Sequence, residues 1–336
     1  MANSERESAA LVLCLLGPTG SGKTDLALRL ADQFPMEIVS VDSAMVYRHM
    51  DVGTAKPDAA LRRRVAHHLI DIHDPWEAYS AGQFRADALR AIREIQDRQR
   101  VPLLVGGTML YFRALFRGLA RLPEANAGVR ARIDQEASEI GWPALHAELR
   151  TVDAVAAARI DQHDRQRIQR ALEVYRLTGQ PISSLQQQTD PVKGLRFFRI
   201  ALMPRVRQDL YRRLDARFSD MIQSGLVAEV DRLMTFPLMS VDRPAMRAVG
   251  YRQIWKYLAG EIGLAEAERQ AVVATGRLAK RQLTWLRSET VDLTLDALAF
   301  DALPRLTSAV MSAGVSRPAE RCNMIEQPLE CREHGV

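Results

Sequence analysis

The sequence is poor in cysteine and has no long hydrophobic run. Its three cysteines, Cys14, Cys322 and Cys331, do not form a disulfide framework, and we expect Cys14 to lie in the core. No apolar stretch approaches the roughly 18 to 20 residues of a membrane-spanning helix, and the first residues lack a cationic and then apolar signal sequence. We therefore expect a cytoplasmic protein that makes no membrane contact.

The chain also lacks the signature of nucleotide hydrolysis. It has no run of four apolar residues ending in Asp-Glu, which would supply a second magnesium ligand, and no evident group to orient a water molecule. A phosphate-binding loop in such a chain is expected to hold a diphosphate that leaves, rather than a triphosphate that is hydrolysed.

What the chain does have is a complete phosphate-binding loop of the kind found in nucleotide-binding and ATP-binding proteins. Directly after the apolar run 11–16, the sequence fits G-x-x-x-x-G-K-[ST]. Its glycines let backbone N–H groups point at phosphate oxygens, Lys23 adds positive charge, and the Thr24 hydroxyl can ligate Mg²⁺. The helix expected next would direct its positive end at the anion. The predicted phosphate-binding residues are Gly17, Pro18, Thr19, Gly20, Ser21, Gly22, Lys23 and Thr24.

Strand patterns alternate with helical patterns along the chain, which predicts an α/β fold with a parallel sheet flanked by helices, like that of P-loop NTPases. With 336 residues, 47% of them hydrophobic, the chain can bury a sizeable core. The expected strands are 11–16, 37–41, 101–105 and 197–203. Because ligands bind at the carboxyl ends of such strands, the loops at 17–24, 42–43 and 106–108 should converge on one crevice.

The helical patterns divide the chain into four parts. Residues 1–121 form the first part of the P-loop core, and residues 122–195 form an all-helical insertion domain without a strand candidate. Residues 196–312 complete the core and are mostly helical, with long helices expected over 207–233 and 265–286. The polar segment 313–336 is expected to be a disordered tail.

Positive charge is concentrated in the second half of the chain. The formal net charge is +5, and the segment from Arg205 to Arg287 holds 15 Lys and Arg residues against nine Asp and Glu residues. Lysine and arginine side chains near phosphates release condensed counterions. This basic segment favours a polyanionic partner, although a solvated charged surface would give the same composition.

Asp42 follows the second expected strand directly. A carboxylate at this position can act as a general base, bind Mg²⁺ or cap the next helix, and capping is the simplest interpretation for the residue alone. It begins the segment Asp-Ser-Ala-Met-Val-Tyr-Arg-His-Met-Asp-Val-Gly-Thr-Ala-Lys-Pro, residues 42–57, and a further segment, Gly-Gly-Thr-Met-Leu-Tyr, spans 106–111.

These ordered motifs resemble those of the bacterial tRNA dimethylallyltransferases, also called tRNA isopentenyltransferases. That family shares the phosphate loop, a D-S-x-x-x-Y-x-x-[ML]-D-[IV]-G-T-A-K-P segment and a G-G-T-x-x-Y segment. Further similar segments lie at 67–71, 164–173, 225–230, 250–251 and 280–285, so the resemblance covers about residues 11–287.

The resemblance implies transfer of a dimethylallyl group from dimethylallyl diphosphate to N6 of the adenosine 3′ of a tRNA anticodon, with release of diphosphate and Mg²⁺ as the cofactor. It implies the anticodon stem-loop of tRNA and dimethylallyl diphosphate as partners, and we expect a monomer. By the same resemblance Asp42 is the general base and Thr108 hydrogen-bonds the bridging oxygen of the leaving group. Arg217 is expected to stabilise the charge that develops on that group.

The segments that match the tRNA-contacting segments of the family supply the candidate RNA ligands. Basic side chains can follow the phosphate backbone and Trp285 can stack on a base, although any one of these residues alone is more typical of a surface charge or a core position. The candidates are Asp42, Ser43, Ala44, Met45, Gln166, Arg167, Ile168, Gln169, Arg170, Arg247, Gly250, Tyr251, Arg252, Lys280, Arg281, Trp285 and Arg287.

Two other functions remain open at this point. A small-molecule kinase of the nucleoside type would share the phosphate loop and sheet, but it gives no joint role to Asp42 and Thr108. A non-catalytic RNA-binding protein that uses the loop as a switch would explain the basic segment, but it does not require those two side chains.

Overall fold

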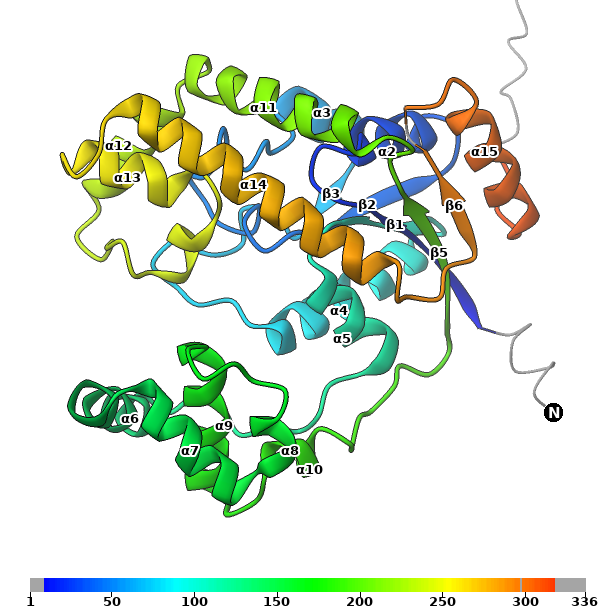
Figure 1. Cartoon of the computed structure of the whole chain (residues 1–336). Coiled ribbons are helices and arrows are strands. Elements are labelled where there is room, and N and C mark those ends of the chain that lie inside the picture. Colours follow the sequence, from blue (N-terminus) through cyan, green and yellow to red (C-terminus); the bar gives the residue numbers. More distant parts are fainter. Residues whose placement is uncertain (1–8, 297, 318–336) are drawn as a thin grey trace, which may run out of the picture.

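A sheet of parallel strands forms the centre of the computed structural model, which describes residues 9–296 and 298–317 (Figure 1). The strands follow the order β3-β2-β4-β1-β5-β6, and neighbours pair in parallel. Within the described residues, they are β1 (Ala10–Leu16), β2 (Met36–Val41), β3 (His67–His68), β4 (Val101–Gly106), β5 (Leu195–Leu202) and β6 (Leu293–Leu295). The predicted parallel α/β fold is confirmed, and the short edge strands β3 and β6 are additions to it.

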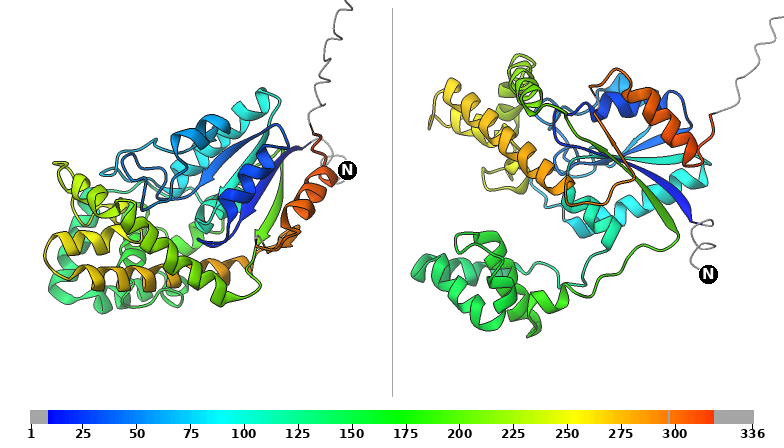
Figure 2. Two further views of the ribbon diagram at one scale, coloured as in Figure 1. Left: turned by 90° about the horizontal axis from the view of Figure 1, so that it is seen from above. Right: turned by 45° about the vertical axis from the view of Figure 1, so that its right-hand side comes forward.

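Helices cover both faces of this sheet (Figure 2). Strand β1 is buried over most of its length and β2 over all of it, as parallel strands between two helical layers must be. On one face α4 (Ala81–Asp97) and α5 (Met109–Arg117) complete the core. On the other face α2 (Lys23–Ala31) and α15 (Ala302–Ser312) do so, with α3 (Ala59–Arg64) at the border.

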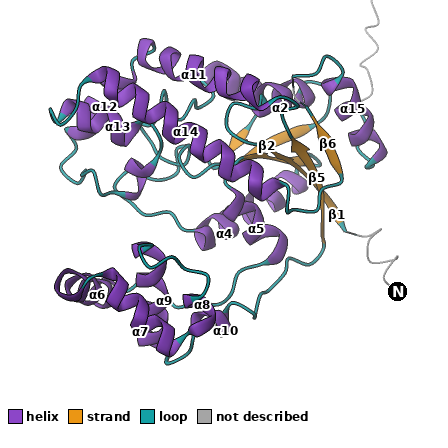
Figure 3. Cartoon of the chain, viewed as in Figure 1, coloured by secondary structure: helices purple, strands orange, loops and turns teal. Residues whose placement is uncertain are grey.

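Between α5 and β5 the chain forms a separate group of helices that contains no strand in this described segment (Figure 3). These helices are α6 (Ala127–Ile140), α7 (Trp142–Val152), α8 (Ala154–Ala157), α9 (Arg165–Thr178) and α10 (Ile182–Leu185). They enclose a core of their own, which includes the fully buried Ile133, Leu145 and Leu172. This group occupies the segment that the sequence analysis assigned to a helical insertion.

A further helical layer lies beside the sheet and is built from the second half of the chain (Figure 1). It comprises α11 (Arg207–Gln223), α12 (Leu226–Met234), the 3₁₀ turn η1 (Pro244–Arg247), α13 (Tyr251–Leu258) and α14 (Leu264–Leu286). The single helix expected over 207–233 was wrong, because the chain breaks at Gly225, whose φ of 100° lies in the left-handed region. The helix expected over 265–286 is confirmed as α14.

The ordered chain extends beyond α15. Val315 is 5% exposed and packs in the core under α2, and Arg317 donates a hydrogen bond to the Gln33 side chain. The rest of the predicted tail, residues 318–336, lies outside the described residues, as do Cys322 and Cys331. Cys14 is fully buried in β1, as predicted. No described helix is both long and apolar enough to cross a membrane.

Candidate active site

Three loops converge at the carboxyl edge of the sheet, as the sequence predicted. Strands β1, β4 and β2 lie side by side, and their last residues, Leu16, Gly106 and Val41, are in register. The Gly17 N–H donates to the Gly106 carbonyl (3.3 Å), and the Thr108 N–H donates to the Val41 carbonyl (3.2 Å). Main-chain hydrogen bonds therefore tie the phosphate loop, the Asp42 loop and the Thr108 loop to one another.

The phosphate loop has the backbone geometry of an anion site. Gly20 and Gly22 adopt φ values of 76° and 87°, which other residues rarely reach, and α2 begins at Lys23. The start of that helix places unpaired N–H groups and the positive end of the helix dipole beside the loop. Thr24 is exposed at this helix start, where its hydroxyl is accessible to a metal bound to phosphate.

Lys23 and Arg217 share one electrostatic environment with Asp42. Burial lowers the pKa of Lys23 to about 7, against an opposing effect of Asp42, and the neighbouring Arg217 lowers it further. Burial also lowers the pKa of the Arg217 guanidinium, with Asp42 opposing and Arg213 adding to the shift. Arg217 thus reaches from α11 into the site that the phosphate loop and Asp42 form, which supports placing it among the candidate catalytic residues.

Of the three roles that the sequence left open for Asp42, the structure shows the cap. Its Oδ1 accepts hydrogen bonds from the N–H groups of Ala44 (2.8 Å) and Met45 (3.3 Å), which caps the turn after β2. Its other oxygen, Oδ2, has no hydrogen bond to the described residues, so it can accept a proton. Capping fixes the carboxylate in place and leaves the second oxygen for chemistry.

Thr108 contacts Ser43, the residue next to Asp42. Its hydroxyl oxygen accepts a hydrogen bond from the Ser43 N–H (3.1 Å), and its O–H donates one to the Ser43 Oγ (3.4 Å). Behind it, Tyr111 is 4% exposed and stacks on Phe84 with ring centroids 4.2 Å apart. The Gly-Gly-Thr-x-x-Tyr motif therefore pairs an accessible hydroxyl with an aromatic anchor for the start of α5.

Gln282 lies in the similar segment 280–285 but was not predicted to belong to the phosphate site, and it contacts two of the three loops. Its Oε1 accepts the Thr19 N–H (2.9 Å), and its Nε2 donates to the Gly107 carbonyl (2.8 Å). A further sequence signal was its helical position: it lies on the buried face of α14 with Ala279, Leu283 and Leu286, and a glutamine on an apolar face needs polar partners.

Sequence analysis also missed Glu229 on α12, which is 1% exposed. Its carboxylate accepts the N–H groups of Asp51 (2.9 Å), Val52 (2.8 Å) and Gly53 (3.2 Å), together with the Tyr251 hydroxyl (2.6 Å). This buried carboxylate joins the segment after Asp42 to the outer helical layer.

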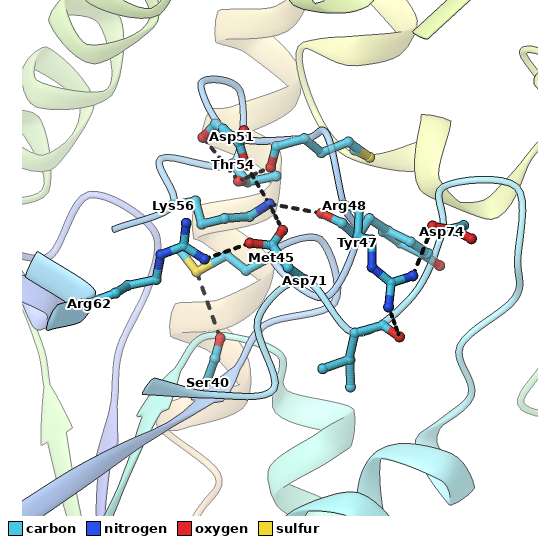
Figure 4. A network of polar contacts seen from close by, with 12 residues as sticks. Ser40, Met45, Tyr47, Arg48, Asp51, Thr54, Lys56, Arg62, Asp71 and Asp74 are labelled. Carbon is cyan, nitrogen blue, oxygen red and sulfur yellow. Dashed lines mark hydrogen bonds and ion pairs between the residues drawn. The ribbon is translucent and has the colours of Figure 1, made fainter. Parts of the chain in front are cut away.

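A buried lysine organises the same segment (Figure 4). The Lys56 side chain is 1% exposed, and its Nζ donates to the Tyr47 carbonyl (2.8 Å), Asp51 (2.7 Å) and Asp71 (2.6 Å). Burial would raise the pKa of Asp71, but its hydrogen bonds to Lys56 and Arg62 lower it overall. These charges hold the segment between β2 and β3 against the loop that follows β3.

A pocket of about 630 Å³ opens beside this network. Its wall includes Lys56, Arg62, Asp220 and also Arg217, the arginine that shares the electrostatic environment of Lys23. Arg217 thus belongs to the wall of this pocket and also influences the charge of Lys23.

The candidate RNA ligands fall into three groups in the structure, namely exposed, partly exposed and buried residues. Exposed side chains are Ser43, Gln166, Arg167, Arg247, Lys280, Arg281 and Arg287, and partly exposed residues are Asp42, Ala44, Met45, Gln169, Arg170, Arg252 and Trp285. Gln166 of α9 accepts a hydrogen bond from Arg247 of η1 (3.0 Å), so the structure brings the helical insertion and the outer layer together here. Trp285 packs partly against the sheet core.

The remaining candidates are buried. Ile168 and Tyr251 have no exposed surface, since Ile168 packs in the insertion core and Tyr251 binds Glu229. Gly250 is also buried, with a φ of 98° where α13 begins. Ile168 and Tyr251 therefore present no side-chain surface to RNA in this structure, and RNA contact at these two residues and at Gly250 stays a prediction.

Comparisons with known proteins follow the same motifs. A family model described as IPP transferase matches residues 45–289. The chain is 52% identical over 314 residues to a tRNA dimethylallyltransferase of Burkholderia thailandensis, covering 92% of this chain and 97% of that protein. It is 54% identical over 296 residues to one of Thiobacillus denitrificans, covering 88% and 95%.

Solved structures show the same likeness. The tRNA isopentenylpyrophosphate transferase from Bacillus halodurans superposes with a TM-score of 0.65 at 34% identity, covering 90% of this chain and 96% of that one. A eukaryotic dimethylallyltransferase acting on tRNA superposes with a TM-score of 0.74 at 23% identity, covering 93% and 82%, and shows the shared fold.

Proposed function

The chain belongs to the IPP transferase family, and from this membership we propose that it is a tRNA dimethylallyltransferase. The proposed substrates are dimethylallyl diphosphate and tRNA, and the proposed acceptor is N6 of the adenosine 3′ of the anticodon. One observation carries the proposal: the phosphate loop, Asp42 and Thr108 meet at one edge of the sheet, with Lys23 and Arg217 beside the carboxylate.

In the proposed reaction the adenosine N6 attacks the allylic carbon that carries the diphosphate. The new C–N bond forms as the C–O bond breaks, and the electron pair of that bond leaves with the diphosphate. Asp42 Oδ2 takes the proton that N6 loses, since Oδ1 is held by the Ala44 and Met45 N–H groups. The Thr108 hydroxyl donates a hydrogen bond to the bridging oxygen as negative charge develops on it.

The leaving diphosphate is held by fixed positive groups. The phosphate-loop N–H groups, the start of α2, Lys23 and Arg217 surround the place where its charge grows. Mg²⁺ is the proposed cofactor, with Thr24 as its protein ligand, and when bound it neutralises charge on the phosphate oxygens. The described residues contain no cluster of three or more His, Cys, Asp or Glu side chains for a metal. A hydroxyl together with substrate phosphates is a donor set that Mg²⁺ accepts.

The proposed tRNA surface follows the exposed cations of α14, η1 and the start of α9. Extruding the target base from its stack costs a few kcal/mol, which contacts to neighbouring phosphates and bases must offset. The proposed enzyme acts as a monomer, and we place the reaction in the cytoplasm. The kinase alternative finds no support in the relatives and structures described above.

The direct test is incubation of the protein with unmodified tRNA, Mg²⁺ and dimethylallyl diphosphate, followed by mass analysis of the digested nucleosides. We expect adenosine to gain one dimethylallyl group, and the gain to disappear in Asp42→Ala. Turnover of ATP with a small acceptor, without any such gain, would replace the proposal by the kinase function. Tight tRNA binding with neither reaction would leave a non-catalytic RNA-binding protein.

A further inference from the structure

Gln282 occupies an unusual place for a side chain of a long helix. It lies on the buried face of α14 at 9% exposure, yet both ends of its amide are bonded to loops of the active site. The Thr19 N–H that it accepts belongs to the phosphate loop, and the Gly107 carbonyl to which it donates lies one residue before Thr108. A single amide therefore connects the phosphate loop, which is proposed to hold the diphosphate, to the loop of Thr108, which is proposed to assist its departure.

The backbone at Gly107 lies so close to this amide that a side chain there would collide with it. A Cβ atom added to Gly107 would lie 2.5 Å from Gln282 Nε2 and 3.0 Å from the Gly17 carbonyl oxygen. Gly107 has no positive φ in this structure, so close approach is the property that requires a glycine here. The α14 amide, the Thr108 loop and the first residue of the phosphate loop are thus in direct contact.

We propose that Gln282 is a positioning residue, which sets the spacing between the phosphate loop and Thr108. This inference rests on the proposed function for the roles of those two loops. In this role the amide acts through the Thr19 and Gly107 backbone groups to which it is hydrogen-bonded. Because a misplacement of about 1 Å at a reacting centre can cost on the order of 100-fold in rate, a loosened spacing weakens both diphosphate binding and turnover.

The test compares Gln282→Ala with Gln270→Ala, a matched change of the same residue type on the same helix. Among the described residues, the Gln270 side chain hydrogen-bonds only to Glu266 of its own helix, one turn away. For Gln282→Ala we expect kcat/KM for dimethylallyl diphosphate to fall about 100-fold, with a contribution from each parameter. For the same variant we expect the dissociation constant for tRNA to change less than about twofold. Gln270→Ala should resemble the unaltered enzyme in kcat, in KM for dimethylallyl diphosphate and in the dissociation constant for tRNA.

A double-variant cycle identifies the contact itself. Gly107→Ala displaces the Gln282 amide, so alone it should reproduce the loss seen in Gln282→Ala. In Gly107→Ala/Gln282→Ala the new methyl group no longer meets the amide and keeps only its 3.0 Å approach to the Gly17 carbonyl oxygen. The loss of kcat/KM in the double variant should therefore stay within about threefold of the loss in the worse single variant and should not reach the product of the two losses. Multiplying losses would show that the two residues act independently and would overturn the proposal.

Two further results would also overturn it. One is a Gln282→Ala enzyme with unchanged kcat/KM, and the other is an equal weakening of tRNA and diphosphate binding, which would indicate a general loss of structure. Binding of inorganic diphosphate with Mg²⁺, measured by calorimetry, separates this inference from the proposed function. If the unaltered protein prenylates no tRNA, the function fails, but a loss of diphosphate affinity in Gln282→Ala still supports the positioning role.

Discussion

The loops predicted to bind diphosphate and the surface predicted to bind tRNA are held in different ways. The loops are fixed by main-chain hydrogen bonds and by the buried side chains of Gln282 and Glu229. Two of the tRNA candidates on α14, Lys280 and Arg281, are exposed cations. A reacting centre needs fixed geometry, whereas a flexible polyanion is bound by many weak and adjustable contacts.

This difference has a consequence for substitution. Removing one fixed group from the loops should disturb chemistry or folding strongly, because no neighbour can take its place. Removing one exposed cation should weaken tRNA binding slightly and leave the chemistry intact. The following variants are ordered from the largest expected effect to the smallest.

Asp42 should show the largest effect. We expect Asp42→Ala to lower kcat by about 10²- to 10⁴-fold, because the proton on N6 loses its acceptor. Asp42→Asn is the informative control, since its side-chain oxygen can still accept the Ala44 N–H and preserve the cap. Single-turnover rates of both variants decide between the roles: an Asp42→Asn enzyme near full activity would leave capping as the only function of the residue.

Glu229 should be the largest contributor to stability in this comparison. Glu229→Ala leaves three N–H groups and the buried Tyr251 hydroxyl without their acceptor, and we expect the free energy of unfolding to fall by about 3 to 5 kcal/mol. Urea unfolding followed by circular dichroism measures this loss. Glu139→Ala, on the exposed side of α6, should stay within about 0.5 kcal/mol. Equal effects of the two variants would contradict the anchoring role.

Lys23 should give the site a pH dependence. Its lowered pKa of about 7 means that the ammonium loses its proton as pH rises above 7, so affinity for dimethylallyl diphosphate should fall between pH 7 and pH 9. In Lys23→Met we expect weaker affinity that no longer changes over this interval. Calorimetric titrations at the two pH values measure it, and a pH-independent affinity in the unaltered protein would disprove the role of the ammonium.

The lowered pKa of Lys23 also affects the free energy of unfolding. Because the pKa of Lys23 is about 7 in the folded protein and 10.5 for an ordinary lysine, the folded chain binds fewer protons between these values. The contribution of Lys23 to the free energy of unfolding therefore rises with pH across that window. Lys23→Met should remove this rise, as urea unfolding at pH 7 and pH 9 would show.

Arg281 represents the small effects. We expect Arg281→Ala to weaken tRNA binding about three- to tenfold and to lower the slope of log affinity against log salt by about 1, with kcat unchanged. The control is Arg305→Ala, on α15, whose guanidinium lies 3.8 Å from Asp301. Filter-binding titrations at several salt concentrations distinguish them, and identical salt slopes would remove α14 from the proposed tRNA surface.

Local sequence was enough to predict the parts of the site that follow strand ends. The phosphate loop, Asp42 and Thr108 each come directly after a buried strand, so their convergence followed from the rule for parallel sheets. The contacts of Gln282 and Glu229 were not predictable in this way, because their hydrogen-bond partners are distant in the sequence. Thr19 lies 263 residues from Gln282, and Asp51 lies 178 residues from Glu229. Nothing in a local pattern states which distant backbone group a buried polar side chain will meet.

The same limit applies to the fold. The four long strands were visible as apolar runs, whereas β3 and β6 have two and three residues and carry too little pattern. The end of α11 was missed because apolar periodicity continues through Ser224 and Gly225, and only the left-handed backbone of Gly225 separates the helices. Ile168 and Tyr251 were assigned to RNA by motif, but burial is a property of the packed chain.

The connection of the insertion to the core has a consequence for engineering. The chain leaves the core at Gly118 and returns at Asp190, and these residues adjoin so closely that a Cβ on Gly118 would lie 2.3 Å from the Asp190 oxygen. Ala120 and Thr189 form an antiparallel bridge, and Arg85 holds the Asp190 carbonyl. The two ends of the segment that contains helices α6–α10 therefore lie next to each other. A short hairpin turn between them is expected to replace this segment without distorting the sheet. The chemistry of the remaining core could then be studied without the helical insertion.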